Sequence, residues 1–249
     1  MFTSDKDDNN LFSRVDDALS LSQIRHKPSF LGFLNEREQY IISGQFSFAK
    51  DRIRFFGGYE NAARKVMCAY DYDISDEDFP IEKLCYKFRK EDSLSHRDFL
   101  GSLMGLGIER SCVGDILVGD GYAAVFVKSE VSDYIKSQLS KIGRAGVKLI
   151  SEDECDISYE PDTEVLTYIV SSMRLDSVVS AITKLSRAKA ASLINSGKVF
   201  TNYSENCKVS YFLKPDDILT IRGNGKFIIK EQSSTTKKGR LKINIVHYR

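Results

Sequence analysis

The sequence contains no long hydrophobic run. No apolar stretch approaches the roughly 18 residues that a helix needs to cross a bilayer. Residues 1–10 are polar and acidic, unlike a secretory signal peptide. Hydrophobic residues still make up 42% of the 249 positions, enough for a packed core. We therefore expect a cytoplasmic protein with a folded core and no membrane partner.

Closely spaced metal ligands are also missing. The five cysteines, at positions 68, 85, 112, 155 and 207, form no Cys-x-x-Cys pair, and the three histidines are equally scattered. Isolated thiols suit a reducing compartment better than a disulfide framework or a zinc site. The acidic residues at positions 71, 73 and 76–78 resemble a calcium loop but lack its central glycine. We predict a solvated acidic loop there, and no metal or other cofactor.

Charge is unevenly distributed along the chain. Of the 36 Lys/Arg residues, 15 lie between positions 174 and 249 beside only 5 of the 35 Asp/Glu residues, which leaves 21 basic and 30 acidic residues before them. A basic end on an acidic body favours a polyanionic partner for the C-terminal third. Two domains that merely differ in surface charge would give the same numbers, so composition alone leaves both interpretations open.

The N-terminal region, residues 1–60, is predicted to be helical. Apolar residues recur at helical spacing from Leu11 through Val15 to Leu19, and Pro28 ends the run. A second helix is expected over residues 35–43, with Asn35 as its N-cap. Residues 52–56 alternate charged and bulky side chains. This pattern is typical of a strand or of a basic-aromatic loop. These side chains are a weaker candidate for a second RNA contact, because packing in the core or in a loop is the more common use of such a segment.

Residues 61–151 are predicted to form a mixed domain. We expect strands at 66–70 and 83–88, a helix at 95–106, a hairpin of 115–118 with 122–127, a helix at 131–139 and a strand at 147–150. The order strand, helix, strand, strand, helix, strand is that of a ferredoxin-like, RRM-like βαββαβ domain. The fold class is therefore predicted as α+β. This topology hosts many functions and does not indicate one by itself.

A linker with a short strand is expected over residues 152–171, a C-terminal module over 172–232, and a basic strand or tail over 233–249. Ser172 and Ser186 are predicted N-caps of two helices, and Gly197 is predicted to end the second helix. Strands are expected at 199–202, 218–221 and 227–229, because turn signals separate these segments.

The module contains a series of short motifs in a fixed order. They are Arg174-Leu175-Asp176, Ser186-Arg187-x-Lys189-Ala190, Leu193-Ile194-x-x-Gly197-x-Val199, Asn202, Asp217-x-Leu219 and Arg222-Gly223. This string resembles the S4 RNA-binding domain, which several RNA-handling proteins share. The residue after Asn202 departs from the family pattern, because Tyr203 stands where a glycine is usual. The departure bears on the local turn.

The charged residues of the module suit a phosphate partner. Arg187 and Lys189 lie in the first turn of a helix, where free N–H groups favour an anion and cations are unfavourable for the helix dipole. We predict that a phosphate completes the site and that Asp176 orients Arg174 or Arg187. The predicted RNA-binding residues are Arg174, Ser186, Arg187, Lys189, Lys198, Asn202, Lys208, Arg222 and Lys226. For any single lysine, a solvated surface charge is an equal alternative.

A second motif lies in the middle domain. It reads Gly105-Leu106-Gly107-Ile108-x-Arg110, followed by Val113-Gly114-Asp115-Ile116. With a helical start before it and the S4-type module after it, the chain resembles the YlmH-type proteins of bacterial cell-division gene clusters. The resemblance implies a cytoplasmic protein that binds rRNA and tRNA on the large ribosomal subunit. It also implies a part in translation and ribosome quality control, through the rescue of stalled ribosomes.

No enzyme signature accompanies these motifs. Pseudouridine synthases carry a catalytic aspartate in an Arg-Leu-Asp motif, but here Arg174-Leu175-Asp176 is part of the module and no synthase domain fits after it. A methyltransferase needs a glycine-rich loop between a strand and a helix, and the glycines here lack that context. We predict a non-enzymatic RNA-binding protein without a small-molecule substrate. The alternative is an RNA-modifying enzyme with an unrecognised active site in the middle domain.

Overall fold

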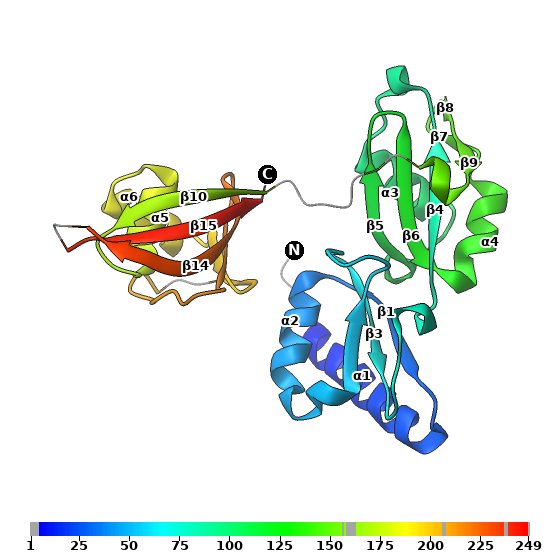
Figure 1. Cartoon of the computed structure of the whole chain (residues 1–249), viewed down its shortest axis with the longest axis horizontal. Coiled ribbons are helices and arrows are strands. Elements are labelled where there is room, and N and C mark those ends of the chain that lie inside the picture. Colours follow the sequence, from blue (N-terminus) through cyan, green and yellow to red (C-terminus); the bar gives the residue numbers. More distant parts are fainter. Residues whose placement is uncertain (1–4, 156, 158–162, 206–207, 237–238, 249) are drawn as a thin grey trace. The chain divides into compact units, whose positions relative to one another are not determined.

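The computed structural model, shown in Figure 1, describes residues 5–155, 157, 163–205, 208–236 and 239–248. The chain divides into two compact units, Met1–Glu160 and Pro161–Arg249. Both units combine helices with antiparallel sheets, which confirms the α+β class. In the described part of the chain, no helix has the length and apolar character needed to cross a membrane.

A helical pair and a small sheet form the first part of unit one. The elements are α1 (Asp5–Arg25), β1 (Ser29–Leu34), α2 (Glu36–Gln45), β2 (Ile53–Phe56) and β3 (Lys65–Ala69). α1 buries Leu11, Val15 and Leu19, as their spacing predicts. α2 begins at the predicted N-cap, because Asn35 Oδ1 accepts from the Glu38 backbone N–H at 3.0 Å and the Glu38 carboxylate accepts from the Asn35 N–H at 2.7 Å.

The region after α1 is not simply helical, and the prediction for residues 1–60 is corrected here. β1, β3 and β2 form a three-stranded sheet in that order, and residues 53–56 are a strand rather than a loop. Residues 29–34 are almost uniformly apolar, and a short run without alternation cannot be assigned from periodicity. β3, predicted as the first strand of the middle domain, pairs with β1 and β2 instead.

The second part of unit one is a four-stranded sheet. Its elements are β4 (Ile81–Lys87), α3 (His96–Gly105), β5 (Val113–Val118), β6 (Tyr122–Lys128), α4 (Ser129–Gln138) and β9 (Lys148–Ile150), with a short hairpin of β7 (Lys141–Ile142) and β8 (Ala145–Gly146) before β9. The strand order is β5-β6-β4-β9. These elements match the predicted segments apart from small differences at their ends. Phe99 of α3 and Ile135 of α4 pack against Val125 on one face of the sheet.

The other face of this sheet is covered by the first part of the unit. Ala124 and Phe126 are buried there in one cluster with Phe33 of β1 and Val66 of β3. The approach is close, because a Cβ on Gly114 would lie 2.5 Å from the Phe33 ring. Side chains at alternate positions along β6 therefore enter two different cores. The two sheets of unit one share the second of these cores.

Unit two is a six-stranded antiparallel sheet with two helices packed against it. Its elements are β10 (Thr163–Val170), α5 (Leu175–Thr183), α6 (Arg187–Asn195), β11 (Val199–Thr201), β12 (Ser204–Glu205), β13 (Ile218–Ile221), β14 (Gly225–Thr235) and β15 (Leu241–Tyr248). The strand order is β10-β15-β14-β13-β11-β12. Leu219, Phe227 and Ile245 face Val178 and Ile194 of the helices in one buried core.

Strands on both sides of residues 172–232 belong to this same sheet. β15 lies between β10 and β14, so the C-terminal strand joins the segment before the module to the hairpin inside it. The prediction placed a short strand in the first segment and a strand or tail in the second, but it did not join either of them to the sheet of the module. Their pairing depends on residues far apart in the chain, and local patterns do not reveal it. Part of the predicted linker over residues 152–171 lies outside the described residues.

Candidate nucleic-acid interface

The first helix of unit two begins at Leu175, and its N-cap is Arg174 rather than the predicted Ser172. The Leu175 backbone N–H donates to the carbonyl of Tyr211 at 2.7 Å. This bond satisfies an amide at the helix start that a capping side chain would otherwise serve. Arg174 is therefore held in extended backbone at the very start of α5.

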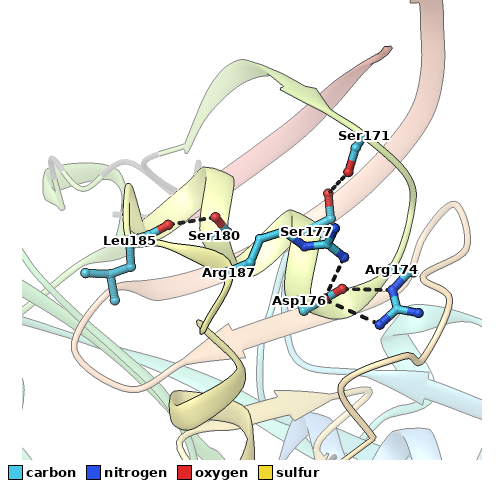
Figure 2. Close-up of polar contacts among 7 residues, drawn as sticks. All are labelled: Ser171, Arg174, Asp176, Ser177, Ser180, Leu185 and Arg187. Carbon is cyan, nitrogen blue, oxygen red and sulfur yellow. Dashed lines mark hydrogen bonds and ion pairs between the residues drawn. The ribbon is translucent and has the colours of Figure 1, made fainter. Parts of the chain in front are cut away.

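Asp176 lies between two arginines, as Figure 2 shows. Its Oδ2 accepts a hydrogen bond from Arg187 Nη2 at 2.7 Å, and its Oδ1 accepts one from Arg174 Nε at 3.1 Å. The Asp176 side chain is 8% exposed, whereas those of Arg174 and Arg187 are 35% and 52% exposed. A buried carboxylate thus holds two guanidinium groups that remain open to solvent. The predicted orienting contact of Asp176 is confirmed, and it reaches both arginines.

The charge of this cluster is set by the arginines. Burial raises the pKa of Asp176, but the hydrogen bonds from Arg174 and Arg187 outweigh it and hold that pKa below its ordinary value. Asp176 is therefore ionised at neutral pH. One negative charge faces two positive charges, so the cluster keeps a net positive charge. Guanidinium groups fixed in this way suit the bidentate recognition of phosphate.

The second helix begins at the predicted cap. Ser186 Oγ accepts from the Lys189 backbone N–H at 3.3 Å, and Arg187 is the first helical residue. Asp176 compensates the charge of Arg187, whereas Lys189 is exposed and has no ion pair among the described residues. A cation in the first turn opposes the helix dipole. The unpaired Lys189 therefore favours an anionic partner at this helix start.

Hydrogen bonds to serine side chains brace the same region (Figure 2). Ser171 and Ser177 lie 3.1 Å apart through their hydroxyl oxygens, and Ser180 Oγ donates to the Leu185 carbonyl at 2.7 Å. The second bond spans the connection between α5 and α6. The two helix starts, and the arginines on them, are thereby held in fixed positions.

Asn202 has a role inside the fold. Its Nδ2 donates to Asp217 Oδ1 at 2.8 Å, and its Oδ1 accepts from the Ile218 backbone N–H at 2.9 Å. Asn202 and Tyr203 form the two-residue turn between β11 and β12, with φ values of +49° and +64°. Such a turn prefers Asn-Gly, so Tyr203 occupies a position that suits glycine better. Both ends of the Asn202 amide are engaged in holding this turn.

A second group of predicted residues lies at the hairpin of β13 and β14 and contacts aromatic rings, with Arg222 in the turn and Lys226 on β14. The Arg222 guanidinium lies 5.1 Å from the Phe200 ring centroid, and Lys226 Nζ lies 4.9 Å from that of Tyr248 and 5.8 Å from that of Tyr203. Lys226 and Tyr248 are direct cross-strand neighbours. Arg222 and Lys226 were predicted as contact residues, but the aromatic rings beside them were not. The pairing of each cation with its ring depends on strand register, which the sequence does not show.

The two remaining lysines lie next to these groups. The Lys198 carbonyl accepts from the Arg222 backbone N–H at 2.9 Å, which places Lys198 beside Arg222. The Lys208 carbonyl accepts from the Tyr211 N–H at 2.9 Å. The Tyr211 carbonyl in turn accepts from the Leu175 N–H at the start of α5, so Lys208 lies near that helix start. Both lysines are exposed. Each therefore adds positive charge near one of the two groups.

The basic-aromatic segment of unit one is used in packing. Arg54 Nη2 pairs with Asp76 at 2.5 Å, and the Phe56 ring meets the Phe79 ring edge-on with centroids 5.4 Å apart. Asp78 accepts from the Ser75 backbone N–H at 2.7 Å. These contacts favour the packing interpretation of residues 52–56. They also give two of the acidic residues between 71 and 78 structural partners.

Comparison with known proteins identifies the family. The family model described as "Putative RNA-binding domain in YlmH" matches residues 75–156. Ribosome-associated protein quality control protein P2 of Bacillus subtilis (strain 168) is 31% identical over 236 residues, which cover 92% of each chain. The chain belongs to the YlmH family. A solved structure, cell division protein ylmH from Streptococcus pneumoniae, is 20% identical with a TM-score of 0.49, covering 63% of this chain and 98% of the other.

The segment that the YlmH model matches contains the second motif, Gly105 to Ile116, but none of the S4-type motifs of unit two. Residues 75–156 include β4 through β9, whereas Arg174, Arg187 and Lys226 all lie beyond it. The description of the matched segment names RNA binding, yet none of the predicted contact residues lies there. In this member of the YlmH family, both units therefore need to be considered for RNA contacts.

Proposed function

We propose that this chain is a non-enzymatic, ribosome-associated RNA-binding protein of the cytoplasm that acts in ribosome quality control. The name of the Bacillus subtilis relative and the RNA-binding description of the matched family model support this role. The more specific proposal is that the chain recognises structured rRNA and tRNA on the large ribosomal subunit. That part rests on unit two, which we propose to contain an S4-type RNA-binding domain over residues 172–232.

The single observation that carries the proposal is the pair of arginines fixed by a buried aspartate. Asp176 holds Arg174 and Arg187 at two helix starts with both guanidinium groups partly exposed. Such a surface reads an RNA by its backbone and shape more than by its base edges. The proposed contact residues are Arg174, Ser186, Arg187, Lys189, Lys198, Lys208, Arg222 and Lys226. Asn202 supports the surface by holding its turn.

For the middle domain we propose the ferredoxin-like βαββαβ fold. The succession β4, α3, β5, β6, α4, β9 and the strand order β5-β6-β4-β9 support it. We place the start of this domain after Ala69, because β3 pairs with the N-terminal strands. We retain residues 152–171 and 233–249 as flanking segments of the S4-type domain, each contributing a strand to its sheet.

The middle domain gives less support to a modifying enzyme. Such an enzyme would need paired titratable groups in a cavity. A cavity of about 570 Å3 lies beside β5 and the start of α3, and His96 is the titratable side chain in its described lining. Burial and the nearby charge of Arg110 lower the pKa of His96. One imidazole provides no acid–base pair there. A second cavity, of about 230 Å3, is lined by Asp76, Glu77, Lys83 and Glu152, but Lys83 forms an ion pair with Glu152 and Asp76 forms one with Arg54. These pairings favour the non-enzymatic proposal.

Sedimentation with ribosomes tests the proposed function. The native chain and the Arg174→Ala/Arg187→Ala/Lys189→Ala variant are mixed with a cell lysate and separated on sucrose gradients at low and moderate salt. The native chain is expected to sediment with the large subunit and the variant to remain at the top, because the phosphate contacts are lost.

A matched control separates a local effect from a loss of net charge. Lys184→Ala/Lys214→Ala/Lys230→Ala removes the same charge from the same unit at positions outside the proposed contacts. This control is expected to sediment like the native chain. If the two triple variants dissociate equally, the interaction depends on net charge and the proposed site is wrong.

A further inference from the structure

Unit one contains a small cavity with a cationic lining. Its volume is about 200 Å3, below the roughly 300–1,000 Å3 of pockets for drug-sized ligands. Its polar lining residues come from α1, the start of α2, the segment before β3 and the turn before β5: Arg14, Asn35, Glu38, Arg64, Arg110 and Ser111. We call the part formed by Arg14, Arg64 and Arg110 the arginine pocket.

Backbone carbonyl groups hold two of these arginines in place. Arg64 donates from Nε to the Val113 carbonyl at 3.0 Å and from Nη2 to the Phe33 carbonyl at 2.7 Å. Arg110 donates from Nη1 to the carbonyls of Val113 and Gly114. Among the described residues, Nη1 of Arg64 and Nη2 of Arg110 donate to no protein group. Each guanidinium is therefore fixed on one side and available on the other.

The pocket has an excess of positive charge. Three guanidinium groups line it against one carboxylate, that of Glu38, which already accepts from the Asn35 N–H at 2.7 Å. Burial and the charge of the neighbouring Arg110 lower the pKa of Arg64 to about 10. The charges of Glu38 and Asp115 act in the opposite direction, but the net effect still lowers this pKa, because like charges at close range disfavour each other. An anion between the arginines would relieve this repulsion.

We propose that the arginine pocket binds a phosphate group, and that an RNA strand supplies it. The planar donor fork of arginine matches phosphate, and a cavity of this size accepts a small anion rather than a whole nucleotide. Arg110 and Ser111 lie in the segment whose family description names RNA binding, whereas Arg14 and Arg64 precede it. The site is therefore shared between the two parts of unit one. The RNA source rests on the proposed function, whereas the phosphate site itself does not.

One face of the middle-domain sheet is closed by the N-terminal part of unit one, so an RNA contact in this unit must lie elsewhere. RRM-type domains stack bases on the open face of their sheet. Here that face is buried, because Phe126 is 1% exposed in a cluster with Phe33 and Val66. The layer that closes the face also supplies Arg14 and Arg64 to the pocket. The same packing that removes one RNA surface thus builds a site for the RNA backbone.

Arg14→Gln in the full chain is the sharpest test. Arg14 is exposed on α1 and has no ion pair among the described residues, so we expect its replacement to leave the fold intact. Binding to purified large-subunit rRNA is measured at several KCl concentrations. Removing one phosphate contact is expected to reduce the slope of log K against log salt by about 0.7–0.9. Arg25→Gln, the same change on the same helix outside the pocket, is expected to keep the native slope.

A second measurement identifies the source of the phosphate. Thermal unfolding of the native chain and of Arg14→Gln is followed in inorganic phosphate and in KCl of equal ionic strength. Phosphate should stabilise the native chain more than the variant. If phosphate stabilises the native chain but Arg14→Gln leaves the salt slope of rRNA binding unchanged, the pocket binds a free phosphorylated ligand. That result would overturn RNA as the source of the phosphate. If neither effect depends on Arg14, the site is overturned, while the separate Arg174/Arg187/Lys189 test still decides the proposed function.

Discussion

Asp176 of α5 and Arg187 of α6 are joined by a hydrogen bond of 2.7 Å between two helices that are otherwise linked by a short turn. The carboxylate is buried and the guanidinium is half exposed. The contact therefore serves two purposes. It ties the helix starts together, and it presents a cation to solvent in a fixed orientation.

Asp176→Asn is expected to lower the free energy of unfolding of unit two by about 1–2 kcal/mol, because a buried amide cannot replace two charge-assisted hydrogen bonds. The partial exposure of both arginines keeps the loss below that of a fully buried pair. Hydrogen exchange of amides in residues 175–194 measures the change. Asp216→Asn, which breaks the exposed pair with Lys230, is the control and should change stability by under about 0.5 kcal/mol. Equal losses in the two variants would contradict the central role of Asp176.

The stabilisation by Asp176 is expected to depend on pH. Its pKa in the folded chain is below the ordinary value of 3.8, so the unfolded chain binds the proton more readily. The stabilisation is therefore fully present above that value and is lost as pH falls through the folded pKa. The stability difference between the native chain and Asp176→Asn should stay constant above about pH 5 and shrink below about pH 4. Urea unfolding at a series of pH values measures it, and a difference unchanged down to about pH 2 would exclude this linkage.

Local signals predicted much of this arrangement. Ser186 and Asn35 were recognised as caps from the residues that follow them, and α1 was recognised from the spacing of its apolar residues. The contact of Asp176 with Arg174 was predictable because both residues lie in one short motif. These features depend on neighbours within a few positions, where side-chain preferences and helix geometry decide the structure.

Features that depend on distant residues could not be predicted in the same way. β1 carries no alternation, because both its faces are covered by different parts of unit one. The position of Tyr248 beside Lys226 depends on the register of β15. The arginine pocket depends on the packing of α1 and β3 around the turn that contains Arg110. A sequence shows these residues but not the contacts that give them a role.

The turn between β11 and β12 offers two adjacent substitutions with opposite expected effects. Tyr203→Gly should raise the stability of unit two by about 0.5 kcal/mol, because relief of the left-handed backbone exceeds the loss of the ring contact with Lys226. Asn202→Gly should lower it by about 1–2 kcal/mol, because Asp217 and the Ile218 amide lose their partner. Chemical denaturation of both variants measures the effects. A loss of stability in Tyr203→Gly would show that the ring contributes more than its backbone costs.

The shared core of unit one can be tested at a single glycine. A Cβ at position 114 would lie 2.5 Å from the Phe33 ring, so Gly114→Ala must push the N-terminal sheet away from the middle domain. We expect a loss of about 1–3 kcal/mol, the usual cost of overpacking. Gly101→Ala is the matched control, because nothing lies within 4 Å of a Cβ there and the site is inside α3, where alanine should stabilise by about 0.5–1 kcal/mol. Thermal unfolding of both variants shows whether each substitution lowers or raises the free energy of unfolding. Because Gly114 is next to Val113, whose carbonyl holds Arg64 and Arg110, a destabilised Gly114→Ala should also lose its phosphate stabilisation. A variant that unfolds earlier but keeps the full phosphate effect would separate the packing of the two sheets from the geometry of the pocket.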